Sequence, residues 1–264
     1  MKKMLTLALA LILGLTSCSS KPQAAPQTES VELYVFAAAS MTETMDEIIE
    51  NYKTEAPNVT IIPTYDSSGT LLTQIQEGAD CDLFISAAQT QMNTLDESGG
   101  LLEGSRVDLL ENKVALTVPD GNPKGIESFD QLAELLKAGD VMLAMGNSDV
   151  PVGQYTQKIF DYYGLDEAAM AGAGVLTYGS NVKEVTTQVS EATVDCGIIY
   201  GTDTASANLT VVDTATAEMC GQVIYPAAVL ADSAHASEAQ AFLDYLRTTA
   251  CSQVFEGVGF APLS

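Results

Sequence analysis

The sequence predicts an α/β fold with mostly parallel sheets. Short β-rich runs alternate with segments of helical periodicity along most of the chain, and this order is typical of parallel strands joined by crossover helices. The chain has 264 residues, enough for one large domain or two small ones. No repeat with a fixed solenoid period is present.

The first half of the chain contains four strand patterns, at residues 31–38, 58–65, 81–87 and 113–119. Helices are expected after the first two strands. The segment that follows the first strand places five apolar residues on one helical face: Met41, Met45, Ile48, Ile49 and Tyr52. Residues 128–139 form another expected helix, because Ser128 and Gln131 have the spacing of a capping box and Gly139 is a stop signal.

The second half repeats the alternation. Strands are expected at 141–146, 174–179, 196–201 and 223–230, and helices at 153–164 and 181–192. Residues 237–255 are expected to form one closing helix. The strand near Lys113 and the strand near Ile224 are the expected crossings between two lobes.

The first 17 residues are expected to be a lipoprotein signal peptide. Lys2 and Lys3 precede an apolar run at 4–15, which is too short for an ordinary membrane span. The following "LTSC" resembles a bacterial lipobox, in which Cys18 would be lipidated. Residues 18–30 then form a flexible polar tether. The alternative is an ordinary signal peptide that is cut elsewhere, which would leave the protein periplasmic.

The formal net charge of −24 argues against nucleic acid as a partner, because nucleic-acid binding requires basic patches. No segment after the signal approaches about 18 consecutive apolar residues. Contact with the membrane is therefore expected only through the lipid anchor, on the outer face of the cell membrane.

Four further cysteines are widely spaced and do not form a zinc pattern: Cys81, Cys196, Cys220 and Cys251. One interpretation is a disulfide between Cys220 and Cys251, because an exported protein allows it. The other is four free, buried thiols. No nearby histidine would activate any of them as a nucleophile.

Candidate binding residues lie where strands meet helices. Ser40, Ser68, Val152 and Val182 each stand at an expected helix start, where free N–H groups and the helix dipole attract anions. Tyr200 ends a strand. In open α/β sheets ligands bind at the carboxyl ends of strands, so an anion site is expected where these strands and helices meet.

Each of these signals alone has a purely structural explanation. Ser40 and Glu43 have capping-box spacing, and a serine at such a position usually only caps its helix. Ser67, Ser68 and Gly69 are also typical of a turn. The argument for a ligand rests on the same arrangement occurring four times.

Five segments resemble, in order, those of the periplasmic molybdate-binding proteins of bacterial ABC transporters. They are "VFAAASMT", "SSGTLLTQIQEGADCDLFISA", "VPVGQYTQKIF", "NVKEVTTQV" and "CGIIYGTDT". The resemblance implies a two-lobed, type II periplasmic-binding-protein fold, with one lobe from residues 31–112 plus 224–264 and the other from 113–223. It also implies a monomer that passes an oxyanion to a membrane permease and that has no cofactor and no catalytic role.

The resemblance implies that molybdate or tungstate is held by the hydroxyls of Ser40, Ser68 and Tyr200 and the N–H groups of Val152 and Val182. The metal would be bound as its oxyanion, with no direct protein ligand. Ser40 and Ser68 would lie on the first lobe and the other three residues on the second, so that binding favours closure of a hinge. Family members typically have alanine at Val152 and often an acid at Asn181.

The residue types suit this ligand. Molybdate and tungstate carry no proton at neutral pH, so a selective site needs donors and no acceptors. Phosphate is partly protonated, and Asp66 and Asp149 are close enough in sequence to keep a phosphate site as an alternative. Sulfate, which is also an unprotonated dianion, is a further alternative.

Two alternatives from other functional classes are a serine hydrolase and a surface lipoprotein that binds another protein. The hydrolase would use Ser40 or Ser68 as its nucleophile, but the sequence has no G-x-S-x-G elbow and its single histidine is His235. A protein-binding lipoprotein would fit the charge and the tether but would not explain the four helix starts.

Overall fold

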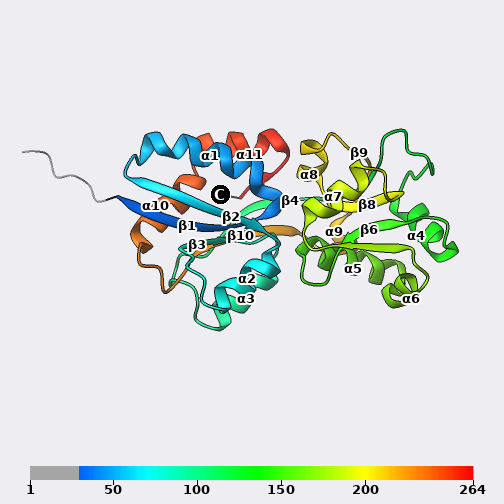
Figure 1. The fold of residues 1–264 in the computed structure, drawn as a ribbon, viewed down its shortest axis with the longest axis horizontal. Coiled ribbons are helices and arrows are strands. Elements are labelled where there is room, and N and C mark those ends of the chain that lie inside the picture. Colours follow the sequence, from blue (N-terminus) through cyan, green and yellow to red (C-terminus); the bar gives the residue numbers. More distant parts are fainter. Residues whose placement is uncertain (1–29, 264) are drawn as a thin grey trace, which may run out of the picture.

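Two β-sheets, each flanked by helices, organise the computed structural model, which describes residues 30–263 (Figure 1). The α/β prediction is confirmed. The predicted signal peptide, the lipidation site Cys18 and all of the tether except Ser30 lie outside the described residues. Within 30–263, no helix combines the length and apolar character needed to cross a membrane.

The first sheet has six strands in the order β11-β4-β10-β3-β1-β2. Their bounds are β1 Val31–Ala38, β2 Val59–Asp66, β3 Leu83–Ile85, β4 Val107–Asn112, β10 Val223–Val229 and β11 Ala261–Pro262. The second sheet has five strands in the order β7-β6-β8-β5-β9. Their bounds are β5 Val114–Val118, β6 Leu143–Gly146, β7 Leu176–Gly179, β8 Cys196–Tyr200 and β9 Thr210–Thr214.

Both sheets are mixed, with less parallel pairing than the sequence predicts. In the first sheet β1 pairs in parallel with β2 and β3, whereas β10 is antiparallel to β3 and β4, and β11 is antiparallel to β4. In the second sheet β6 is parallel to β7 and β8, whereas β5 is antiparallel to β8 and β9. The antiparallel strands include β5 and β10, which carry the chain from one sheet to the other.

Helices cover both faces of the first sheet. Figure 1 shows α1 and α11 on one face and α2 and α3 on the other. The helical elements are η1 Ala39–Met41, α1 Thr42–Glu55, α2 Ser68–Gln76, α3 Gln89–Glu97, α10 Ala236–Leu246 and α11 Thr249–Val258. Helix α1 buries Met45, Ile48, Ile49 and Tyr52, which confirms the apolar face that the sequence predicts.

The helices of the second sheet are α4 Phe129–Ala138, α5 Pro151–Tyr163, α6 Glu167–Gly172, α7 Val182–Ser190, α8 Gly201–Ser206 and α9 Ala217–Cys220. The predicted cap and stop of α4 are confirmed. The N–H of Gln131 donates to Ser128 Oγ at 3.2 Å, and Gly139 ends the helix with a positive φ of 77°.

The predicted closing helix is in fact two helices. Helix α10 ends at Leu246, and α11 begins at Thr249. The break occurs because Thr248 adopts an extended conformation and caps α11, accepting a hydrogen bond from the N–H of Cys251 at 3.5 Å.

All four cysteines in the described part of the chain are free, so the disulfide expected between Cys220 and Cys251 is wrong. The reason is the fold. Cys220 ends α9, which packs against α5 beside the second sheet, whereas Cys251 lies in α11, which packs against α1 beside the first sheet. Nearness to the end of the sequence did not bring these two thiols together.

The chain passes between the sheets at two places. Strand β4 ends at Asn112 in the first sheet, and β5 begins at Val114 in the second. The return runs from the end of β9 at Thr214 to the start of β10 at Val223. We call the first sheet with its helices the first lobe and the second sheet with its helices the second lobe.

An ion-pair network joins the lobes. Lys183 Nζ in α7 lies 2.8 Å from Glu43 Oε2 in α1 and 3.2 Å from Asp203 Oδ1 in α8. Glu43 is largely exposed, but the Asp203 side chain is fully buried. Apart from this ion pair, the Asp203 oxygens accept no hydrogen bond from the described residues, so its charge is poorly solvated.

Burial raises the pKa of Asp203 to about 6, and the neighbouring Lys183 offsets part of that rise. Since the pKa in the unfolded chain is the ordinary 3.8, the folded protein binds more protons between these two values. This group therefore increases the free energy of unfolding as the pH falls through about 6, and it withdraws that contribution as the pH rises.

We predict that Asp203→Asn flattens the pH dependence of stability. Between pH 7 and pH 5 the wild-type protein should gain about 1 kcal/mol more unfolding free energy than the variant, because asparagine does not titrate. Urea unfolding at both pH values measures the difference. The exposed Asp161, changed to asparagine, controls for the loss of an ordinary carboxylate. Equal pH slopes for the wild type and Asp203→Asn would contradict the prediction.

Candidate functional site

A small cavity lies between the two lobes and brings together all five residues that the sequence singles out. Its lining is Ala38, Ala39, Ser40, Ser68, Ala87, Val150, Pro151, Val152, Val182 and Tyr200. Its volume is about 10 Å³, far below the roughly 300–1,000 Å³ of pockets for drug-sized ligands. The cavity therefore suits a small ion.

Three helices begin at this cavity. Ser68 is the first residue of α2, Val152 the second of α5, and Val182 the first of α7. The N–H groups of a first helical turn have no acceptor within their own helix, and the dipole adds partial positive charge there. Pro151, at the first position of α5, suits a helix start because its missing N–H is not needed.

Small residues at the end of β1 leave room for the backbone at the cavity. Ala38 ends the strand, and Ala39, Ser40 and Met41 form the short helix η1. Ala38 and Ala39 both line the cavity. The chain therefore has small residues where the end of β1 meets the cavity.

Two of the three cavity hydroxyls are arranged as donors. Ser68 Oγ accepts a hydrogen bond from the N–H of Ala87 at 2.9 Å, so its own proton is free for another partner. The Tyr200 hydroxyl is buried and makes no hydrogen bond of ordinary geometry with the described residues. Burial and the neighbouring Tyr225 raise the pKa of Tyr200 well above 10, so this hydroxyl keeps its proton.

Ser40 is not a helix cap, in contrast to the structural explanation that its sequence offers. Its side chain makes no capping hydrogen bond, and Ser40 Oγ lies 2.9 Å from the hydroxyl of Tyr225. Ser67, rather than Ser68, caps α2, since Ser67 Oγ accepts from the N–H of Thr70 at 3.2 Å. The buried hydroxyls of Ser40 and Ser68 therefore remain available to a ligand.

The carboxylates that favoured a phosphate site do not line the cavity. Asp66 accepts from the N–H of Ser67 at 2.7 Å and from the side-chain amide of Asn181 at 3.4 Å. Asp149 lies outside the lining, although its backbone meets Gly69 of the first lobe. Asn181 caps α7 by accepting from the N–H of Glu184 at 3.1 Å. The lining includes no acidic or basic side chain.

The lobes meet closely beside the cavity. A Cβ atom built on Gly69 would lie 2.1 Å from the backbone oxygen of Asp149, so only glycine fits there. Two further contacts join the lobes there: the hydrogen bond from Asn181 to Asp66 and the ion pair of Lys183 with Glu43. The structure is therefore a closed form of the two lobes.

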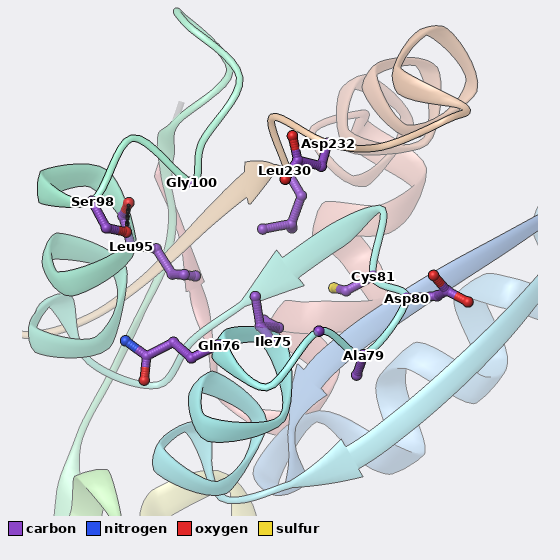
Figure 2. A pocket seen from close by; sticks show the side chains of 11 residues that line it. Ile75, Gln76, Ala79, Asp80, Cys81, Leu95, Ser98, Gly100, Leu230 and Asp232 are labelled. Carbon is purple, nitrogen blue, oxygen red and sulfur yellow. Dashed lines mark hydrogen bonds between the residues drawn. The ribbon is translucent and has the colours of Figure 1, made fainter.

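Larger hollows on the surface lack these features. One lies on the first lobe between α2, α3 and the end of β10, and Figure 2 shows Asp80, Cys81, Leu95, Leu230 and Asp232 around it. Its two carboxylates would repel an anion, and burial raises the pKa of Cys81 to about 12, so the thiol is unreactive.

The described residues place neither a histidine nor a metal-binding group at the cavity. Within residues 30–263 no group of three or more His, Cys, Asp or Glu side chains is placed to hold a metal ion. His235 precedes α10 and does not line the cavity, so neither cavity serine has a histidine beside it among the lining residues.

The sequence did not single out Ala87, Asn112 or Tyr225, although all three contact the cavity serines or support them. Tyr225 carried a usable signal. It lies in an apolar strand before Pro226, and a buried tyrosine generally needs a partner for its hydroxyl.

Comparison with known proteins agrees with this geometry. The model of the bacterial extracellular solute-binding protein family matches residues 33–261. A putative ABC transporter substrate-binding lipoprotein of Bacillus subtilis is 32% identical over 96% of this chain and 95% of the relative. The molybdate-binding protein of Escherichia coli is 31% identical over 87% of this chain and 88% of the relative.

A solved structure has a similar fold. The substrate-binding domain of a putative molybdenum ABC transporter from Clostridium difficile is 31% identical, with a TM-score of 0.66, and the match covers 89% of this chain and 100% of that domain. Sequence, fold and the position of the cavity thus agree, and the chain belongs to the bacterial extracellular solute-binding protein family.

Proposed function

We propose that this protein binds molybdate or tungstate outside the cytoplasm and delivers it to the membrane permease of an ABC importer. The observation that carries the proposal is the convergence of helix N-termini and three hydroxyls, without a carboxylate, on one small cavity. Relatives about 30% identical to this chain, one of them named as a molybdate-binding protein, support the choice of ligand.

The five predicted residues have distinct roles in this proposal. Ser40, Ser68 and Tyr200 donate from their hydroxyls, and Val152 and Val182 donate from their backbone N–H groups. Molybdate and tungstate accept hydrogen bonds at every oxygen and offer no proton in return. A site rich in donors suits such a dianion, whereas a protonated anion offers one acceptor oxygen fewer and finds no carboxylate in the lining to take its proton.

Neutral donors can supply enough free energy for micromolar binding of the anion. Hydrogen bonds to a charged group contribute about 1.5–3 kcal/mol each, so five contribute roughly 8–15 kcal/mol before association costs of at least about 4 kcal/mol. Micromolar binding requires about 8 kcal/mol. The net charge of −24 opposes anion approach, but charges beyond about 8 Å are screened in physiological salt, and the helix dipoles act inside that distance.

The ligand stabilises the closed form in this mechanism. Ser40 and Ser68 belong to the first lobe, and Val152, Val182 and Tyr200 belong to the second, so only closure brings all donors to one ion. In this proposal residues 31–112 with 224–264 and residues 113–223 move as the two lobes. The closed monomer then docks on the permease, while a lipid on Cys18 and the tether at 18–30 keep it at the membrane.

We predict that molybdate and tungstate bind with micromolar or tighter affinity and that Ser68→Ala and Tyr200→Phe each weaken binding. The loss of one charged hydrogen bond should raise the dissociation constant about 10- to 150-fold. Isothermal titration of the purified protein with molybdate, tungstate, sulfate and phosphate measures this.

The exposed positions Ser190 and Tyr162, changed to alanine and phenylalanine, are matched controls. Unchanged affinity in both cavity variants would refute the site. Binding of sulfate or phosphate in preference to molybdate would retain the site but assign it another oxyanion.

We also predict that Gly69→Ala disfavours closure without harming the helix. Gly69 lies inside α2, where alanine is the better helix former, but its Cβ would meet the Asp149 oxygen of the other lobe. Overpacking of about 1–3 kcal/mol in the closed form alone corresponds to a roughly 5- to 150-fold weaker affinity for molybdate.

The control is Gly257→Ala in α11, where an added Cβ would meet nothing within 4 Å. Titration with molybdate and ligand-free thermal unfolding together test the prediction. An affinity for molybdate equal to that of Gly257→Ala would show that Gly69 does not limit closure.

A further inference from the structure

We propose that Tyr225 and Asn112 are positioning residues that point the proton of Ser40 into the cavity and thereby select a fully deprotonated oxyanion. This inference rests on the proposed function and deepens it. It concerns a chain of side-chain hydrogen bonds behind the cavity: Ser40, Tyr225, Asn112 and Thr202.

The orientation of the Asn112 amide is set by the backbone. Asn112 Oδ1 accepts from the N–H of Lys113 at 2.8 Å, so its Nδ2 group faces the other way. Nδ2 donates to the Tyr225 hydroxyl at 3.1 Å and to Thr202 Oγ1 at 3.0 Å. Since an amide nitrogen only donates, the Tyr225 oxygen must accept.

The need to pair the Tyr225 proton favours one direction for the next bond. This proton is buried, and Ser40 Oγ lies 2.9 Å away as its acceptor, whereas a Ser40 that donated to Tyr225 would leave the Tyr225 proton without this partner. The proton of Ser40 is then free, and Ser40 lines the cavity. Burial raises the pKa of Tyr225 well above 10, so this hydroxyl retains the proton that it donates.

The chain of side-chain hydrogen bonds is shielded from water. Ser40, Asn112, Thr202 and Tyr225 are all buried, so solvent does not offer competing partners that would reverse the bonds.

Strand β10, which carries Tyr225, is irregular at this residue, because its register shifts between Tyr225 and Pro226. Bulges of this kind redirect side chains, and proline in an interior strand is typical of them.

Ser68 is oriented by the same principle, since it accepts from the N–H of Ala87. Each of the two serines accepts one bond from the protein, so the partner that it still lacks is an acceptor for its proton, and the buried Tyr200 hydroxyl lacks the same partner. Arsenate and phosphate carry a proton at neutral pH and therefore offer these protons one acceptor oxygen fewer than molybdate, tungstate and sulfate. The buried chain thus favours the unprotonated dianions.

Two variants test the direction of the chain. Tyr225→Phe removes the donor to Ser40, so that Ser40 can rotate and accept. Asn112→Asp keeps the shape but replaces the amide donor with a carboxylate oxygen, which would accept from Tyr225 and reverse the chain. Tyr155→Phe is the control, because it also removes one buried tyrosine hydroxyl next to the cavity residue Tyr200. The ring of Tyr155 packs against that of Tyr200 with centroids 6.4 Å apart, and Tyr155 lies outside the cavity lining.

The measurement is titration of each purified protein with molybdate, followed by displacement of molybdate with arsenate and with sulfate. Tyr225→Phe should weaken molybdate binding about 2- to 12-fold, the loss expected for one neutral hydrogen bond. In both variants the preference for molybdate over arsenate should fall more than the preference for molybdate over sulfate. A general loss from the added charge in Asn112→Asp would lower the affinity for all dianions together.

The outcomes separate the two proposals. A wild-type protein that binds no molybdate overturns the proposed function. A wild-type protein that binds it, with variants that keep both preferences within about twofold of Tyr155→Phe, overturns the role of Tyr225 and Asn112 alone. Loss of all three oxyanions in equal proportion also overturns it, because a merely structural defect would not distinguish a protonated ligand from an unprotonated one.

Discussion

The structure depends on the placement of several helix N-termini around one buried space between two lobes. Helices α2, α5 and α7 begin there, on different lobes, and each leaves unpaired N–H groups at its first turn. Such groups cost free energy if they are buried without an acceptor. An anion in the cavity would be an acceptor for those that Ser67 and Asn181 do not cap, which explains why closure and binding belong together in the proposed mechanism.

The net charge of the protein differs from the charge at the cavity. The chain has a net charge of −24, yet the carboxylates of Asp66, Asp149 and Asp203 do not line the cavity. Asp66 accepts hydrogen bonds from Ser67 and Asn181, and Asp203 forms an ion pair with Lys183. The same residues that hold the lobes together thus keep negative charge engaged away from the ligand.

Polar groups behind the cavity decide how its hydroxyls are used. A serine can donate or accept, so its presence in the lining does not by itself define the ligand. The backbone N–H of Ala87 for Ser68, and the Asn112–Tyr225 pair for Ser40, each donate to one lone pair of the serine oxygen and leave the serine proton for the ligand. Selectivity between anions of similar shape can arise in this way without any charged contact.

The sequence by itself determined the alternation of strands and helices, the cap of α4, the apolar face of α1 and the residues at the helix starts. These are local features, because periodicity and capping depend on residues a few positions apart. Only the tertiary structure decided the antiparallel pairing of β5 and β10, the free state of Cys220 and Cys251, and the partnership of Ser40 with Tyr225, 185 positions away. Such contacts depend on how the chain crosses between the lobes, and no local pattern encodes that distance.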